Sequence, residues 1–119
     1  MGTQPRIEAD IQIIPTPVIP IIPETIPEKI ERYSLKYNVN PITVNKVISC
    51  ESNYNPNNIG DNGTSFGLVQ IHLPAHPNIT KSQALDPDFA IDYLTKNLKA
   101  GNGRMWTCYR NRVLISGVE

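Results

Sequence analysis

The 119-residue sequence has no excess of either charge, no long apolar run and few cysteines. Its 11 Lys and Arg residues balance 11 Asp and Glu residues, so attraction to nucleic acid or to an acidic membrane surface is not expected. No run reaches the roughly 18 apolar residues of a membrane-spanning helix. The first residues, MGTQPRIEADIQIIP, lack the basic start, long apolar stretch and cleavage site of a signal peptide. This length and composition predict a single domain.

Cysteine is represented only by Cys50 and Cys108, whose spacing matches no metal-binding motif. A disulfide between them would close a loop of about 58 residues and would stabilise the fold by about 3 to 4 kcal/mol in the chain-entropy model. Such a bridge would also indicate an oxidising compartment outside the cytoplasm. Two buried free thiols are the alternative interpretation.

Proline is concentrated near the N-terminus, where six of the 11 prolines precede residue 28. Because proline fixes φ and disfavours helix in the residue before it, residues 1–24 are predicted to be extended. The Ile and Val residues between the prolines are unusual for a solvated linker. We interpret the segment as a linker or as a strap along the domain, with docking on a partner as the alternative, and place the domain at residues 25–119.

Helical start signals and apolar spacing recur along this domain. The first predicted helix starts at a capping box of Thr25 and Glu28, and the next two start at Asn-Pro and Asp-Pro pairs. These segments are residues 25–38, 40–51 and 86–101. Their predicted apolar positions are Ile30, Tyr33, Leu35, Tyr37, Ile42, Val44, Val47, Ile48, Ala90, Ile91, Leu94 and Leu98. Residues 53–65 show only turn signals and strand-like alternation is almost absent, so the predicted fold class is mainly α.

Glu51 ends the second predicted helix, beside Cys50 and before a turn-rich stretch. Burial would raise the pKa of this carboxyl, and so would the partial negative charge of a helix C-terminus. A carboxyl that stays protonated near pH 6 can act as a general acid on a glycosidic oxygen. An exposed glutamate in a last helical turn is the alternative interpretation of this feature taken alone.

Three ordered motifs, ESNYNP, GTSFGLVQI and AIDYL, together resemble the transglycosylase SLT family, the lysozyme-like lytic transglycosylases related to goose-type lysozymes. The resemblance covers roughly residues 28 to 110. It implies a compact lysozyme-like helical domain that cleaves the β-1,4 bond between N-acetylmuramic acid and N-acetylglucosamine in peptidoglycan. It further implies that glycan strands are the partner, that the protein is a monomer, and that it works outside the cytoplasm (periplasmic, cell-wall or secreted) without a cofactor.

The resemblance also assigns roles to individual residues. Glu51 matches the catalytic acid, Tyr93 matches the aromatic residue of the last motif, and the positions that match the floor of the cleft are Ser65, Gly67, Leu68 and Gln70. Gly67 would let sugar or backbone approach closely, and Gln70 offers hydrogen-bond donors and an acceptor to a sugar. Tyr54 and Tyr93 either contact the ligand site, by stacking on sugars or by reaching Glu51 with their hydroxyls, or pack in the core. Core positions are the better interpretation for Phe66, Leu68 and Ile71.

Asp61 is a candidate second carboxylate. Lytic transglycosylases are understood to use one glutamate as acid and then as base, which leaves a 1,6-anhydromuramoyl end. The Gly-Asp at Asp61 resembles one of the aspartates that position water in goose-type lysozymes, but His72 takes the place of the other. A hydrolase using Asp61 is therefore an alternative function, while Asp61 is also a good turn former beside Asn62-Gly63.

His72 and His76 are four residues apart, but Pro74 between them disfavours a helix and no third ligand is nearby, so no metal site is expected. His72 either lines the glycan cleft or is a structural or surface histidine. Cys108 follows Met105 and Trp106, which would give apolar cover to Glu51 if the disulfide forms. Because the domain is short for the family, a module that binds peptidoglycan without cleaving it is a further alternative.

Overall fold

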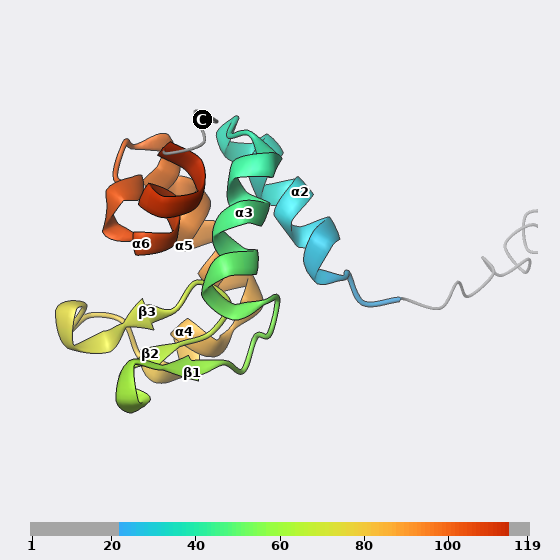
Figure 1. The fold of residues 1–119 in the computed structure, drawn as a ribbon. Helices are drawn as coiled ribbons and strands as arrows, with labels where there is room; N and C mark the ends of the chain where they lie inside the picture. Colours follow the sequence, from blue (N-terminus) through green and yellow to red (C-terminus); the bar gives the residue numbers. More distant parts are fainter. Residues whose placement is uncertain (1–21, 115–119) are drawn as a thin grey trace, which may run out of the picture.

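The computed structural model describes residues 22–114 (Figure 1). Apart from residues 22–24, the proline-rich segment predicted at residues 1–24 lies outside the described part of the chain. Its role as a linker or strap and the domain boundary at residue 25 therefore stay predictions. Within residues 22–114, no helix has the length and apolar character to cross a membrane.

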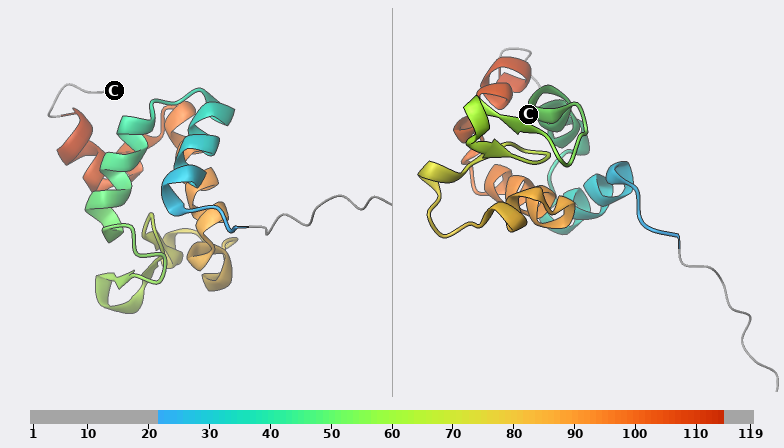
Figure 2. Two further views of the ribbon diagram at one scale, coloured as in Figure 1. Left: turned by 90° about the vertical axis from the view of Figure 1, so that its right-hand side faces the viewer. Right: turned by 90° about the horizontal axis from the view of Figure 1, so that it is seen from below.

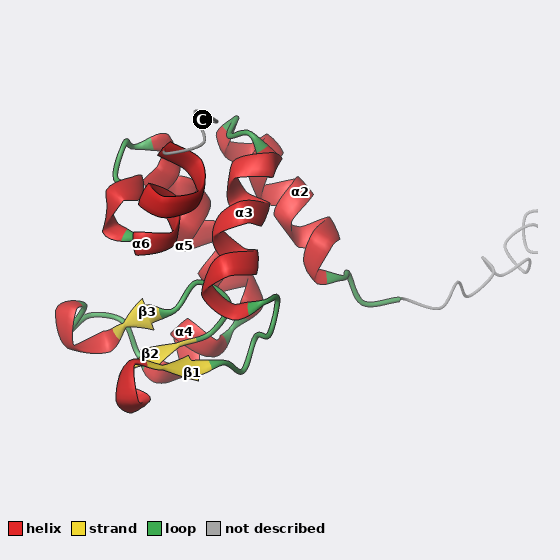
Figure 3. Ribbon diagram, viewed as in Figure 1, coloured by secondary structure: helices red, strands yellow, loops and turns green. Residues whose placement is uncertain are grey.

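Helices dominate the described residues, as predicted from the sequence (Figure 3). The α-helices are α2 (Ile26–Tyr37), α3 (Pro41–Ser52), α4 (Lys81–Leu85), α5 (Pro87–Lys99) and α6 (Thr107–Tyr109). Short 3-10 turns are η1 (Asp61–Gly63), η2 (Leu73–Ala75) and η3 (Gly103–Met105), and a π-helical turn, η4 (Arg110–Leu114), follows α6. The three predicted helices correspond to α2, α3 and α5. Helices α4 and α6 were not predicted from the sequence.

The predicted cap residues begin the three longest helices. Thr25 and Glu28 form a reciprocal capping box at the start of α2, in which the Glu28 carboxylate accepts from the Thr25 N–H at 2.8 Å. Asn40 Oδ1 accepts from the Ile42 N–H at 2.9 Å, and the Asp86 side chain caps α5 in the same way. Each cap satisfies a backbone N–H that has no partner within its helix.

The core contains most of the apolar positions predicted on helices α2, α3 and α5, together with the segment around Leu68. The fully buried side chains include Ile30, Val44, Val47, Ile48, Leu68, Val69, Ile91 and Leu94. Two predicted positions were wrong, because Leu35 is 77% exposed and Ile42 is 55% exposed. At about 100° of rotation per residue, Leu35 turns away from the buried side that holds Ser34, and Ile42 lies almost opposite Val44.

A small antiparallel sheet follows α3, with strand order β1 (Ile59–Gly60), β2 (Ser65–Phe66) and β3 (Ile71–His72). The expectation of turns alone over residues 53–65 was therefore wrong at β1 and at the start of β2. Two-residue strands are too short for alternation to reveal them. The sheet lies beyond the C-terminal end of α3, with α4 against it (Figures 1 and 2).

Gly67 allows the turn between β2 and β3 to pack on α4. Its φ is +86°, a left-handed conformation that favours glycine, and a Cβ at this position would overlap the carbonyl oxygen of Ala84. A close approach of either sugar or backbone was predicted at Gly67. In the structure it is backbone, that of α4, that approaches.

Helices α2 and α5 lie side by side (Figure 2), joined by polar contacts as well as by the core. Asp88 of α5 accepts hydrogen bonds from Lys29 Nζ at 2.8 Å and from the Tyr33 hydroxyl at 3.0 Å. One turn later, Asp92 accepts from the Tyr37 hydroxyl at 2.6 Å. These contacts fix the helical frame that holds α3.

Candidate active site

A cavity of about 550 Å³ opens beside the C-terminal end of α3 and is bordered by the sheet, η2, α5 and the segment around α6. Its lining residues are Glu51, Asp61, Gln70, Ile71, His72, Ala75, His76, Tyr93, Met105, Trp106, Thr107 and Cys108. Five of the predicted catalytic and substrate-binding residues, Glu51, Asp61, Gln70, His72 and Tyr93, thus share one cavity.

Glu51 lies in this cavity with its side chain largely shielded from water. Burial raises the pKa of Glu51 to about 7, from an ordinary value of 4.5. The backbone N–H of Cys108 donates a hydrogen bond to the carboxylate and opposes this rise in pKa, whereas the negative charge of Asp61 adds to it. The carboxyl is therefore partly protonated at neutral pH. The alternative interpretation, an exposed glutamate in a last helical turn, was wrong.

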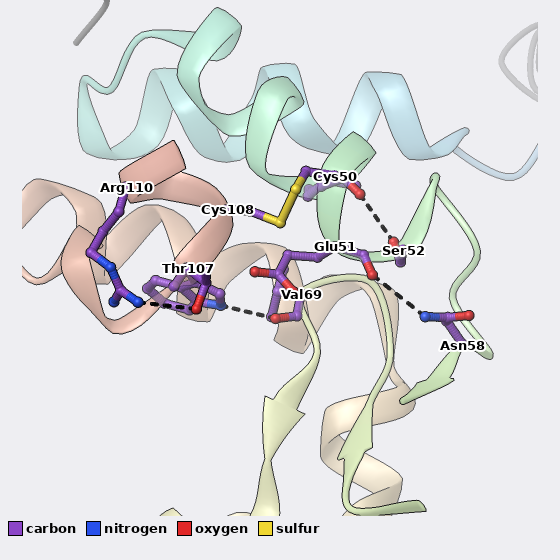
Figure 4. Close-up of a disulfide and its surroundings, with 10 residues drawn as sticks. Cys50, Glu51, Ser52, Asn58, Val69, Thr107, Cys108 and Arg110 are labelled. Atoms are coloured by element: carbon purple, nitrogen blue, oxygen red, sulfur yellow. Dashed lines mark hydrogen bonds between the residues drawn. A yellow bond between two sulfur atoms is a disulfide. The ribbon is translucent and has the colours of Figure 1, made fainter. Parts of the chain in front are cut away.

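A disulfide joins Cys50 to Cys108, with a Cα–Cα distance of 5.9 Å (Figure 4). The alternative of two free thiols was therefore wrong. The bridge attaches α6 to the C-terminal turn of α3, and this attachment places the Cys108 N–H against the carboxylate of Glu51. The disulfide thus contributes directly to the surroundings of the acid.

Trp106 supplies a second attachment of the same segment. Its indole Nε1–H donates to the carbonyl oxygen of Val69 at 2.9 Å, and only 5% of the residue is exposed. The Trp106 ring also meets the Tyr93 ring edge-on, with 5.9 Å between centroids. Trp106 and Met105 both line the cavity, as expected from the sequence, although Met105 is 46% exposed.

Asp61 and His72 line the cavity from the sheet side and are connected through Ser65. The Ser65 hydroxyl donates to Asp61 Oδ2 at 2.5 Å, and its oxygen lies 3.2 Å from His72 Nδ1. The backbone of Asp61 has φ +51°, so the residue forms the turn that the sequence predicted and also faces the cavity.

Tyr93 and Gln70 differ in what they offer to a ligand. The Tyr93 hydroxyl lies 3.2 Å from His76 Nδ1, and burial raises the pKa of Tyr93. Gln70 uses its side-chain Nε2 to donate to the carbonyl oxygens of Asn58 at 3.0 Å and Gly67 at 2.9 Å. Both amide protons of Gln70 are therefore engaged with backbone, which leaves no free donor for a sugar.

Three of the predicted catalytic and substrate-binding residues do not line this cavity. Ser65 is fully buried, and Gly67 packs against α4. Tyr54 lines a different cavity, of about 440 Å³, and its hydroxyl donates to Asn45 Oδ1 at 2.8 Å. The structure therefore separates Tyr54 from Glu51 and gives Ser65 a supporting position.

His76, Ala75 and Thr107 line the cavity but were not predicted there. From the sequence, His76 was a candidate only for metal binding, because its position depends on how the proline-containing turn η2 bends. Among residues 22–114 no group of three or more His, Cys, Asp or Glu side chains is placed to hold a metal ion.

Comparison with models of known protein families identifies the family of the chain without using the geometry of the cavity. The model of the transglycosylase SLT domain matches residues 28–111, which is most of the chain. No curated protein and no solved structure matches the chain significantly. The matched range contains all of the cavity described above, and the family acts on peptidoglycan by lytic transglycosylase-type chemistry. The chain therefore belongs to the transglycosylase SLT domain family.

Proposed function

We propose that this protein is a peptidoglycan lytic transglycosylase that cleaves the β-1,4 bond between N-acetylmuramic acid and N-acetylglucosamine, with Glu51 as general acid and then base. The observation that carries the proposal is the carboxyl of Glu51 in a cavity, with a pKa of about 7. A general acid works best when its pKa is near the operating pH. A module that only bound glycans would have no need for such a carboxyl.

In the first step, protonated Glu51 gives its proton to the glycosidic oxygen while the bond from that oxygen to C1 of the muramic acid breaks. In the second step, the Glu51 carboxylate takes the proton of the 6-hydroxyl on the same muramic acid, and the hydroxyl oxygen bonds to C1. No water is consumed, and Glu51 ends protonated as it began. The products are a 1,6-anhydromuramoyl end and a free 4-hydroxyl on N-acetylglucosamine.

The neighbours of Glu51 support both steps. The Cys108 N–H bonds to the carboxylate and favours its charged form, whereas burial and the charge of Asp61 favour the protonated form. These opposing effects keep the two protonation states close in free energy at neutral pH, as a group that must donate and then accept a proton requires.

Hydrolysis is the second candidate function, because Asp61 lines the same cavity as Glu51. In this mechanism Asp61 would position a water molecule that attacks C1, and the two carboxyl groups would act as in an inverting glycosidase. His72 stands where a second water-positioning aspartate would be, so we favour transglycosylation.

Mass spectrometry of the muropeptides released from purified peptidoglycan distinguishes the two reactions. Transglycosylation predicts mainly 1,6-anhydro ends, whereas hydrolysis predicts reducing ends that are heavier by one water. Reducing ends as the dominant product would replace our proposal with the hydrolase.

The proposal includes the place of action. Peptidoglycan lies outside the cytoplasm, and the Cys50–Cys108 disulfide fits an oxidising compartment. We therefore propose an extracytoplasmic, monomeric enzyme whose partner is the glycan strand and whose chemistry uses no cofactor.

A further inference from the structure

His72 is held by neighbours that determine which of its ring nitrogens carries the proton. His72 in β3 pairs with Ser65 in β2, so its ring lies against the residues of the preceding strand. Its Nδ1 lies 3.2 Å from Ser65 Oγ and 3.3 Å from Thr64 Oγ1. The side chain is 47% exposed and lines the cavity of Glu51.

The hydroxyl protons of Ser65 and Thr64 both take part in hydrogen bonds to other acceptors. Each hydroxyl has one proton to donate. The Ser65 hydroxyl donates to Asp61 Oδ2, because a carboxylate oxygen can only accept. The Thr64 hydroxyl donates to the carbonyl oxygen of Asp61 at 2.7 Å. Neither hydroxyl therefore has a proton left for His72 Nδ1, which must be the donor in this contact.

The charge of Asp61 acts in the same direction. Asp61 Oδ2 lies 4.0 Å from His72 Nδ1, so a proton on Nδ1 is favoured over a bare lone pair facing a carboxylate. In the neutral form of the ring, the other nitrogen, Nε2, then carries no proton and can only accept a hydrogen bond. Nε2 lies on the side of the imidazole ring away from Nδ1, and thus away from Ser65 and Thr64.

An acceptor in this position matters most to a sugar group that can donate but cannot turn its proton towards another acceptor. A sugar hydroxyl can donate to this nitrogen too, but it can also rotate its proton to another acceptor or accept a hydrogen bond instead, so it depends less on this acceptor. The N–H of a 2-acetamido group can only donate. We propose that His72 is a specificity-determining residue whose Nε2 accepts a hydrogen bond from the acetamido N–H of a sugar bound in the Glu51 cavity. This proposal rests on the proposed function, since it takes the cavity to be the glycan site.

The first test measures the tautomer and does not depend on enzyme activity. A long-range proton–nitrogen NMR spectrum of the full chain, recorded with the ring of His72 neutral, reports which nitrogen carries hydrogen. We expect a protonated Nδ1 and an unprotonated Nε2. An unprotonated Nδ1 would overturn the proposal even if the protein cleaves peptidoglycan as we propose.

The second test measures binding of the tetramer of N-acetylglucosamine, with Glu51→Gln present throughout to prevent turnover. His72→Asn keeps a polar group near the place of Nδ1 but has none at Nε2, whereas His72→Gln puts an amide near Nε2. Because one hydrogen bond contributes modestly, we expect His72→Asn to weaken binding about fivefold and His72→Gln to retain most of it. Cellotetraose, which has hydroxyls in place of acetamido groups, should show a smaller difference between the Asn and Gln variants, because a hydroxyl can turn its proton to another acceptor.

Unchanged affinity of the His72→Asn variant for the N-acetylglucosamine tetramer would overturn the proposal. Equal losses in the Asn and Gln variants would overturn it as well, because ring shape rather than the acceptor would then matter. Failure of the Glu51→Gln protein with His72 intact to bind the tetramer would also overturn the proposal. A protein whose activity survives Glu51→Gln would instead contradict the proposed function, and the tautomer measurement would still stand.

Discussion

The buried carboxyl of Glu51 serves the proposed catalysis but lowers the stability of the fold at neutral pH. Its folded pKa is about 7 and its ordinary value is 4.5, so the native state binds the proton more tightly than the unfolded chain does. The stability associated with that proton is fully present below about pH 4.5 and is lost as pH rises through about 7. At neutral pH the Glu51 carboxyl thus lowers the free energy of unfolding.

Replacing this carboxyl should therefore stabilise the protein at alkaline pH. Glu51→Gln is expected to raise the free energy of unfolding by about 2 kcal/mol at pH 8, after allowance for the partial exposure of the group, and to change it little at pH 4. Urea unfolding at the two pH values measures the difference. Glu31→Gln on the exposed side of α2 is the matched control and should show no such pH dependence. Equal stability of the wild type and Glu51→Gln at pH 8 would contradict the raised pKa.

Asp61→Asn should change how activity depends on pH more than it changes the structure. Asparagine tolerates the left-handed backbone at this position and keeps an oxygen for the Ser65 hydroxyl. Removing the negative charge lowers the pKa of Glu51, so the loss of kcat/KM at alkaline pH should begin at a lower pH than in the wild type. An inactive variant, together with reducing-end products from the wild type, would instead assign Asp61 the water-positioning role of a hydrolase.

At the scale of elements, the contact between α3 and α6 forms the surroundings of Glu51. The disulfide, the Trp106–Val69 hydrogen bond and the Cys108 N–H all lie within one short segment. Loss of the disulfide should lower the free energy of unfolding by about 3 to 4 kcal/mol. Activity should also fall at temperatures where the fold survives, because α6 would no longer hold its N–H against the carboxylate.

This prediction is measured by comparing oxidised protein with the Cys50→Ser/Cys108→Ser double variant in thermal melts and activity assays. Thiol titration of denatured, unreduced protein checks the premise. Two free thiols per chain in that titration would contradict the disulfide and remove its support for an extracytoplasmic location.

Some elements could be predicted from the sequence because their signals are local. Capping side chains and Pro-initiated first turns gave the limits of α2, α3 and α5 to within one or two residues. The Thr80–Gln83 capping box was an equally local signal for α4, and it was overlooked. The strands were not predictable in this way, because two residues carry no periodicity.

The site was only partly predictable, because several of its features depend on contacts between distant segments. The motifs identified Glu51, Gln70 and Tyr93, and the likeness to goose-type lysozymes pointed to Asp61 and His72. The fold brings all five to one cavity. No local signal indicates that the amide protons of Gln70 are used by backbone, or that Tyr54 faces another cavity. Leu35 and Ile42 show the same limit for packing, since an apolar residue does not by itself reveal which side of a helix the core covers.

At the scale of the whole molecule, the proline-rich segment is the part whose role is a prediction. If residues 1–24 form a linker, a chain that begins at residue 22 should have the melting temperature of the full chain. A chain that begins at residue 25 also loses the ion pair of Glu24 with Arg32, whose shorter N–O distance is 2.8 Å, and should melt slightly lower. A large decrease on removing residues 1–21 would show that the segment packs on the domain as a strap.

The central claim is that Glu51 transfers the proton in peptidoglycan cleavage. The most direct measurement compares the rate at which wild type, Glu51→Gln and Glu31→Gln release muropeptides from purified peptidoglycan, with circular dichroism to verify that all three are folded. We predict that Glu51→Gln is slower by at least about 10² to 10⁴, the contribution of a general acid, while Glu31→Gln matches the wild type. Near-native release of muropeptides by folded Glu51→Gln would contradict the account.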